Sequence, residues 1–175
     1  LSEKAVISKK ITIVSKTGEE ITISRGFETD DMFQVENGAT LTLGTKETGK
    51  VIVDGASDNA IAYRTVMNAG KFVLCDNASL VNANSSLNGA ALLNSGTAML
   101  SGNVTGNKVG GGTAGKGGAI YAEAGSITTI TAGVYSGNQA KQGGAIYCLG
   151  TLDVSGATFS QNKSNGAEGG AIYAD

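Results

Sequence analysis

The pentapeptide GGAIY occurs three times in this 175-residue chain, at 117–121, 143–147 and 169–173. Its isoleucines, Ile120, Ile146 and Ile172, are separated by 26 residues each time. A fixed period in the range of roughly 20 to 50 residues indicates structural repeats that stack on one another. A looser copy covers 88–107. A glycine precedes the second apolar segment of each unit, at Gly38, Gly70, Gly96, Gly125 and Gly150. Before residue 88 only this spacing persists, without the GGAIY motif.

Each repeat contains three short segments of alternating polarity, for example AIYC, TLDV and ATF between 145 and 159. Alternation buries one face of a strand and exposes the other. The period leaves no residues for a helix, is too short for a propeller blade of roughly 40 residues, and lacks the frame of a leucine-rich repeat. We therefore predict an all-β fold, a right-handed single-stranded parallel β-helix (solenoid) of about six coils of roughly 25–32 residues, with three short strands per coil.

This fold assigns positions to the repeated residues. Ile120, Ile146 and Ile172 are expected to form one interior column, because a shared period gives them the same angular position. Tyr121, Tyr147 and Tyr173 then point outward and form a stacked ladder. The ladder either stabilises the sheet face, as cross-strand aromatic pairs do, or offers a binding platform for sugar rings or a partner protein.

Asparagines and glycines mark the turns. Asn107, Asn138 and Asn162 close the third strand of successive repeats, where asparagine tolerates the left-handed conformation and bonds to the turn backbone. In register, these side chains are expected to form an amide ladder inside the solenoid. The Gly-Gly pair is explained by positive φ or by close approach between coils, both of which favour glycine.

The segments between these asparagines and the next GGAI vary in length: 108–116, 139–142 and 163–168. We expect them to stack as flaps on one edge, where insertions often build a binding surface. The alternative is that this edge simply tolerates insertion. The residues predicted for a contact surface here are Lys108, Thr113, Lys116, Lys141 and Lys163.

Composition narrows the function classes. The net charge is −2 and the lysines are scattered, so no basic stripe indicates nucleic-acid binding. No apolar run approaches the roughly 20 residues of a membrane span, so we expect no membrane insertion by this segment. Two cysteines, Cys75 and Cys148, are too few for a disulfide framework or a zinc site and are expected to be unpaired.

Phosphate, metal and cofactor sites are not predicted. The stretch VGGGTAGKGGAIYA, at 109–122, resembles a phosphate-binding loop, but Gly117 occupies the place of the Ser/Thr hydroxyl that would hold magnesium. Position 116 is moreover variable among the repeats, with Gln142 and Glu168 at the matching places. The calcium-binding nonapeptide of solenoids requires an aspartate in each turn, and GGTAGKGGA has none. We expect no cofactor and no metal.

An enzyme is the alternative to a binding or structural role, since many β-helices cleave polysaccharides. Such chemistry needs two acids about 6.5–9.5 Å apart, or calcium-binding carboxylates with a basic residue. No column of acids recurs in the repeated half, and no histidine is present to shuttle protons. We predict no catalytic residues. The residual case depends on convergence of Asp54, Asp58, Asp76 and Arg64.

The motif pair GGAI and F-x-x-N carries a family resemblance. GGAI is intact at Gly117, Gly143 and Gly169; F-x-x-N is strict at Phe159 to Asn162 and relaxed at Tyr135 to Asn138 and Val104 to Asn107. The combination resembles the repeats of the chlamydial polymorphic outer-membrane proteins and the GGAI-rich coils of wall-attached surface proteins (adhesins) of gut and oral bacteria. The resemblance covers 88–175. It implies an extracellular β-helix that acts as adhesin, stalk or passenger, without catalytic residues.

We thus expect an N-terminal coil or cap over 1–30, a parallel β-helix over 31–175 with regular repeats from 88 to 175, and a longer parent protein. The expected function is that of a non-enzymatic bacterial surface segment, an adhesin or a spacer. A carbohydrate-binding or polysaccharide-degrading, pectate-lyase-like β-helix is the alternative. The expected partner is a glycan or protein on a host or neighbouring cell. The isolated segment is also expected to associate end to end, because an uncapped solenoid exposes its strand edges.

Overall fold

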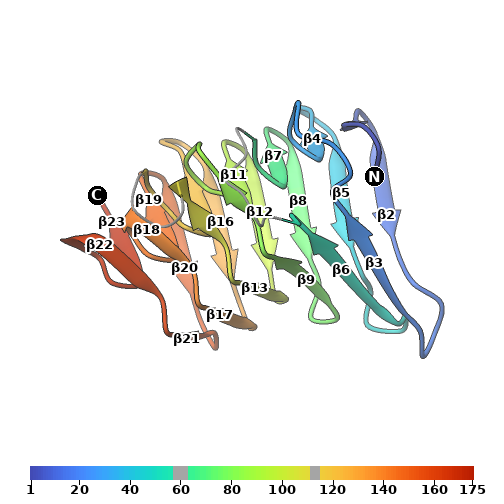
Figure 1. Ribbon diagram of the computed structural model, residues 1–175. Helices are drawn as coiled ribbons and strands as arrows, with labels where there is room; N and C mark the ends of the chain where they lie inside the picture. The colour runs from blue at the N-terminus through green and yellow to red at the C-terminus, as the bar shows by residue number, and fades with distance from the viewer. Residues whose placement is uncertain (57–62, 111–114) are drawn as a thin grey trace.

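The chain winds into about six stacked coils of β-strand, as Figure 1 shows for the computed structural model. The structure describes residues 1–56, 63–110 and 115–175. Neighbouring strands in each sheet come from successive coils and pair in parallel. The prediction of a parallel β-solenoid is confirmed.

Three sheets run the length of the stack. The first consists of β1 (Ala5–Ile7), β4 (Phe33–Val35), β7 (Val66–Asn68), β11 (Leu92–Asn94), β15 (Ile120–Ala122), β19 (Ile146–Cys148) and β23 (Ile172–Ala174). The second consists of β2 (Lys10–Ile13), β5 (Thr40–Leu43), β8 (Lys71–Leu74), β12 (Thr97–Leu100), β16 (Ile127–Ile130) and β20 (Thr151–Val154). The third consists of β3 (Glu20–Ser24), β6 (Lys50–Asp54), β9 (Ala78–Val81), β13 (Asn103–Thr105), β17 (Val134–Ser136) and β21 (Thr158–Ser160).

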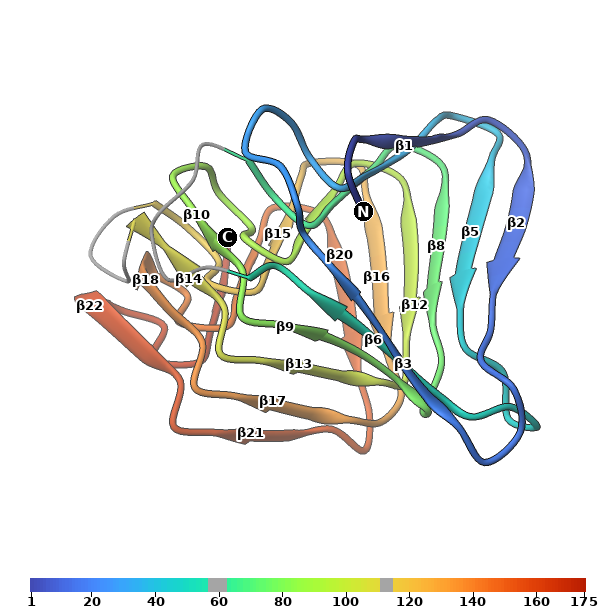
Figure 2. The same ribbon diagram turned by 45° about the vertical axis from the view of Figure 1, so that its right-hand side comes forward.

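A fourth sheet was not predicted. It consists of β10 (Asn84–Ser85), β14 (Lys108–Val109), β18 (Gln139–Gln142) and β22 (Lys163–Glu168), and it projects to one side of the stack (Figure 2). The segments expected to be flaps therefore contain paired strands. A second small core of Ala83, Ala90, Val109 and Ala140 lies behind this sheet. Short strands of small and polar residues carry too little alternation to be recognised in the sequence.

The interior is built from columns of apolar side chains. Ile120 pairs with Ile146, and Ile146 with Ile172, so the three isoleucines stack as expected. The first two are fully buried and the third is partly buried. In the second sheet, the alternating pattern sends Leu41 and Leu43 into the core, and their register partners repeat this on later coils.

The two glycines of GGAI have different roles. Gly117, Gly143 and Gly169 have φ near +60°, a conformation that L side chains rarely adopt. The second glycine allows close approach between coils instead: a Cβ on Gly144 would lie 2.7 Å from Lys163 N and closer still to Gly170 O. Both explanations offered by the sequence therefore apply, one to each glycine.

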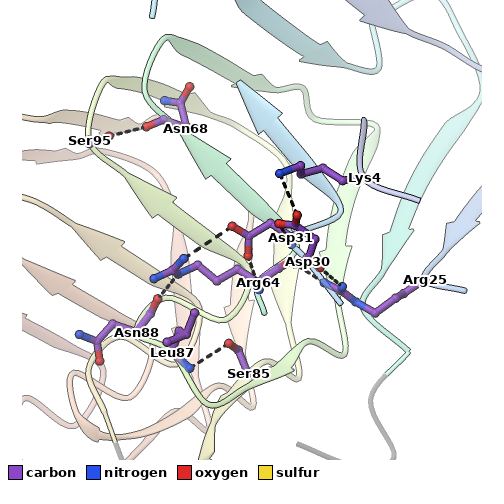
Figure 3. Close-up of polar contacts among 10 residues, drawn as sticks. All are labelled: Lys4, Arg25, Asp30, Asp31, Arg64, Asn68, Ser85, Leu87, Asn88 and Ser95. Atoms are coloured by element: carbon purple, nitrogen blue, oxygen red, sulfur yellow. Dashed lines mark hydrogen bonds and ion pairs between the residues drawn. The ribbon is translucent and has the colours of Figure 1, made fainter. Parts of the chain in front are cut away.

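The early coils lack this glycine pair, and a charged cluster stands in its place (Figure 3). Phe33 and Val66 pair in the first sheet, at the position that isoleucine holds in the later coils. Asp31 and Arg64, two residues before them, therefore occupy the position of the second glycine. Arg64 N donates to Asp31 Oδ1 at 2.6 Å, and the guanidinium Nη1 lies 3.6 Å from Oδ2. Arg64 Nε also donates to Asn88 O at 2.8 Å, which connects the pair to the following coil.

The surroundings of this pair are also charged. Arg25 donates to the backbone oxygens of Asp30 and Arg64, and Lys4 Nζ lies 2.8 Å from Asp30 Oδ2. Burial raises the pKa of Asp31 and lowers that of Arg64, in opposition to their mutual attraction. The hydrogen bond from Lys4 lowers the pKa of Asp30. The cluster links the first four coils where backbone contacts through Gly-Gly are missing.

Gly144→Ala is expected to lower the free energy of unfolding by about 1–3 kcal/mol, because the backbone around the new methyl group must move. Gly170→Ala is the matched control: it holds the same motif position, and its Cβ would meet nothing within 4 Å. Urea unfolding monitored by circular dichroism measures both. Equal losses in the two variants would contradict the close-approach explanation.

Arg64→Ala is expected to destabilise the fold by about 3–5 kcal/mol near pH 7, because it leaves Asp31 buried and unpaired. The raised folded-state pKa of Asp31 means that protonation favours the folded state. The deficit should therefore shrink as the pH falls towards the ordinary aspartate range of about 4. Urea midpoints of wild type and variant across this pH range test it; a deficit independent of pH would assign the loss to packing alone.

Candidate functional site

The outward column of the first sheet holds the three repeated tyrosines. The register places Leu93, Tyr121, Tyr147 and Tyr173 on successive coils. Ring centroids of Tyr121 and Tyr147 are 5.5 Å apart with planes at 20°, and those of Tyr147 and Tyr173 are 4.7 Å apart at 13°. The structure therefore brings the three rings together in one stack.

The stack leaves little of the middle ring accessible. Tyr147 is only 3% exposed, and both of its faces are covered by the neighbouring rings. Lys116 also covers the ring of Tyr147: Nζ donates to Tyr147 Oη at 3.0 Å and lies 4.3 Å from the ring centroid. This hydrogen bond raises the pKa of Lys116. A sugar ring stacks on an open aromatic face, so this geometry favours the stabilising interpretation of the ladder over the platform.

The asparagine column is a continuous amide ladder. Asn107 Nδ2 donates to Asn138 Oδ1 at 3.0 Å, and Asn138 Nδ2 donates to Asn162 Oδ1 at 3.0 Å. The same oxygens accept backbone N–H groups of the preceding coil, from Asn107 and Asn138 respectively. Each side chain thus satisfies main-chain groups at a turn where the ladder of the third sheet ends.

A second amide ladder was missed in the sequence. Asn68 Nδ2 donates to Asn94 Oδ1 at 2.8 Å, and Asn94 Nδ2 donates to Thr128 Oγ1 at 2.9 Å. Both asparagines are fully buried at the ends of first-sheet strands. Their spacing of 26 residues, each two residues before a glycine, was the available signal.

The predicted contact residues separate into three groups. Lys108, Lys141 and Lys163 lie on strands of the fourth sheet. Lys116 bends over the tyrosine ladder instead. Thr113 lies outside the described residues. Lys108 pairs in register with Gln139, and Gln139 with Lys163, so one column alternates between lysine and amide.

The fourth sheet presents these lysines to solvent. Its small core takes up Val109 and Ala140, so Lys108 and Lys141, one position away, face outward. Lys141 and Lys163 are exposed and Lys108 is partly exposed. Within the described part of the chain, none of the three forms an ion pair. At the end of the sheet, Gln142 donates to Glu168.

The described residues of the enzymatic alternative lie apart. Asp54 ends β6, where it accepts from Ala56 N at 2.8 Å, as a turn residue does. Asp76 precedes β9 at the opposite end of the third sheet, about 16 Å away by strand geometry. Arg64 pairs with Asp31, which the sequence did not indicate, and Asp58 lies outside the described residues.

We also searched the described parts of the chain for a metal site, a disulfide and a membrane-spanning helix. No group of three or more acids or cysteines lies close enough there to hold a metal ion. Cys75 and Cys148 are free, as predicted. None of the same residues forms a helix with the length and apolarity to cross a membrane.

The fold and its surface define a repetitive parallel β-solenoid that carries a fourth sheet on one side. Residues 136–149 and 156–175 match the Chlamydia polymorphic membrane protein repeat, which confirms the resemblance over these stretches. The last coils are thus similar to this repeat. Both stretches include a ladder asparagine, a fourth-sheet strand and a GGAIY segment. No curated protein and no solved structure matches the chain.

Asn138→Ala is expected to lower the free energy of unfolding by about 3 kcal/mol, since it strands several buried polar groups that each cost about 1–3 kcal/mol when unsatisfied. Tyr135→Phe, three residues earlier, is the contrasting variant. Burial raises the pKa of Tyr135, and its hydroxyl has no hydrogen-bond partner among the described residues. Its removal should raise stability by about 1 kcal/mol. Chemical denaturation measures both; a loss on Tyr135→Phe would show that the hydroxyl is satisfied in solution.

Proposed function

We propose that this chain is part of an extracellular bacterial surface protein and acts without catalysis, as an adhesin whose stacked coils hold a contact surface away from the cell. The observation that carries the proposal is that both repeat-matching stretches include strands of the fourth sheet, β18 and β22. The repeat therefore encodes a projecting surface as well as a core.

The physical properties of the stack support this role. Successive coils add about 4.8 Å each, so six coils extend for about 29 Å. Ladder hydrogen bonds and buried columns connect every coil to its neighbours, which suits a rigid spacer. Of the described residues considered for catalysis, Asp54 and Asp76 lie apart and Arg64 is paired with Asp31, which supports a role without chemistry.

Adhesion is tested with the whole chain displayed on beads and presented to epithelial cells and to bacterial cells. We expect retention of the beads above that of beads carrying an unrelated β-solenoid. Absence of retention on every surface would reduce the role to that of a spacer and contradict the adhesin proposal.

The enzymatic alternative is tested separately. Incubation with pectin and with host glycans should release no reducing ends and no unsaturated products.

A glycan array with Tyr121→Ala and Tyr147→Ala tests the interpretation of the tyrosine ladder as a binding platform. Selective binding that is lost in these variants would support that interpretation. End-to-end association of the isolated chain stays a prediction, which sedimentation at several concentrations examines.

A further inference from the structure

The fourth sheet is a basic surface on an acidic protein. Its strands and the segments that lead from them to the first sheet carry four lysines and one glutamate among the described residues, namely Lys108, Lys116, Lys141, Lys163 and Glu168. The whole chain has a net charge of −2. Positive charge is thus concentrated on the projecting side, and the remainder of the molecule is acidic.

The arrangement of this charge is periodic. In the column Asn84, Lys108, Gln139 and Lys163, amides and lysines alternate from one coil to the next. Lys108 and Lys163 are two coils apart, about 9.6 Å by strand spacing. Lys141 adds a charge beside the same column. Lys116 contributes less, because its ammonium is bound to Tyr147.

We propose that the fourth sheet binds an acidic polysaccharide that runs along the solenoid axis, with carboxylates or sulfates at the lysines and sugar hydroxyls at the intervening amide. This inference rests on the proposed adhesin function and names the partner class of its surface. Charge complementarity selects an anionic partner. Alternation of lysine with amide fits a glycan whose charge recurs on every second sugar, since the spacing between adjacent coils is comparable to the length of one sugar along a glycan chain.

Nucleic acid fits this surface less well. Its phosphates follow one another at about 3.4 Å per strand in a duplex, which is much denser than lysines at every second coil. Single-stranded binding also depends on aromatic faces on which bases stack. The only aromatic stack next to the fourth sheet, among the described residues, turns its ring faces towards one another.

The test measures binding of the whole chain to immobilised hyaluronan, which carries one carboxylate on every second sugar, with neutral dextran and single-stranded DNA as comparison surfaces. We expect binding to hyaluronan that weakens with added salt. The triple variant Lys108→Ala, Lys141→Ala and Lys163→Ala should bind about tenfold more weakly, because it removes three exposed ion pairs with the glycan. Replacement of the same lysines by arginine should retain the affinity.

The matched control is Lys9→Ala, Lys10→Ala and Lys71→Ala, which removes the same charge from exposed lysines elsewhere on the molecule. We expect a loss of less than about twofold. Equal losses in the two triple variants, absence of binding at low salt, or tighter binding to DNA through the same lysines would each overturn the proposal. Circular dichroism confirms that the variants fold.

The two proposals fail in different ways. If beads carrying the chain adhere to cells equally before and after enzymatic removal of acidic glycans, the adhesin function stands and the glycan inference is wrong. If adhesion is absent although hyaluronan binds through the three lysines, the surface is assigned correctly and the adhesin function is wrong.

Discussion

Parallel hydrogen bonding between successive coils is the constraint on which the rest of this structure depends. Each strand pairs with the equivalent strand one coil away, so identical positions stack directly on one another. A residue type that packs well at one position of a column therefore also packs well at the same position of the next coil. Isoleucine packs on isoleucine in the interior, and the amide of Asn138 bridges those of Asn107 and Asn162 where the strand ladder ends. The fold is stable to the extent that every column has such a self-compatible occupant.

The junction between early and late coils shows what happens when a column changes occupant. At Gly118 and Gly144, the second glycine of the motif lets adjacent backbones approach closely. Arg64 and Asp31 hold the equivalent position two and three coils earlier and join their coils through a buried ion pair, and burial raises the pKa of Asp31 and lowers that of Arg64. The fourth sheet begins with β10, which is followed by Gly89 and Ala90. The later strands β14, β18 and β22 are each followed by a glycine pair.

The stacking of identical positions also determines which surface side chains remain accessible. On the first sheet, stacking directs the tyrosine rings towards each other and leaves Tyr147 almost fully covered. On the fourth sheet, lysines cannot stack on lysines without repulsion, and Gln139 separates Lys108 from Lys163. In the tyrosine column, the ring faces contact one another and are not available to a partner. The second leaves charged groups available to a partner, which is why the proposed contact surface lies there.

The sequence by itself determined the solenoid, its number of coils, and the stacking of the isoleucine, tyrosine and asparagine columns, because the GGAIY copies recur every 26 residues and the later coils each have an asparagine at the end of their third strand. It did not reveal the fourth sheet, whose short strands of small and polar residues have no alternation that exceeds that of a loop. Nor did it reveal the Asp31–Arg64 pair, which joins residues 33 positions apart in the least regular coils. Only the tertiary structure decided which side chains remain accessible, since exposure of Tyr147 and Lys163 depends on neighbours one coil away and not on their own local pattern.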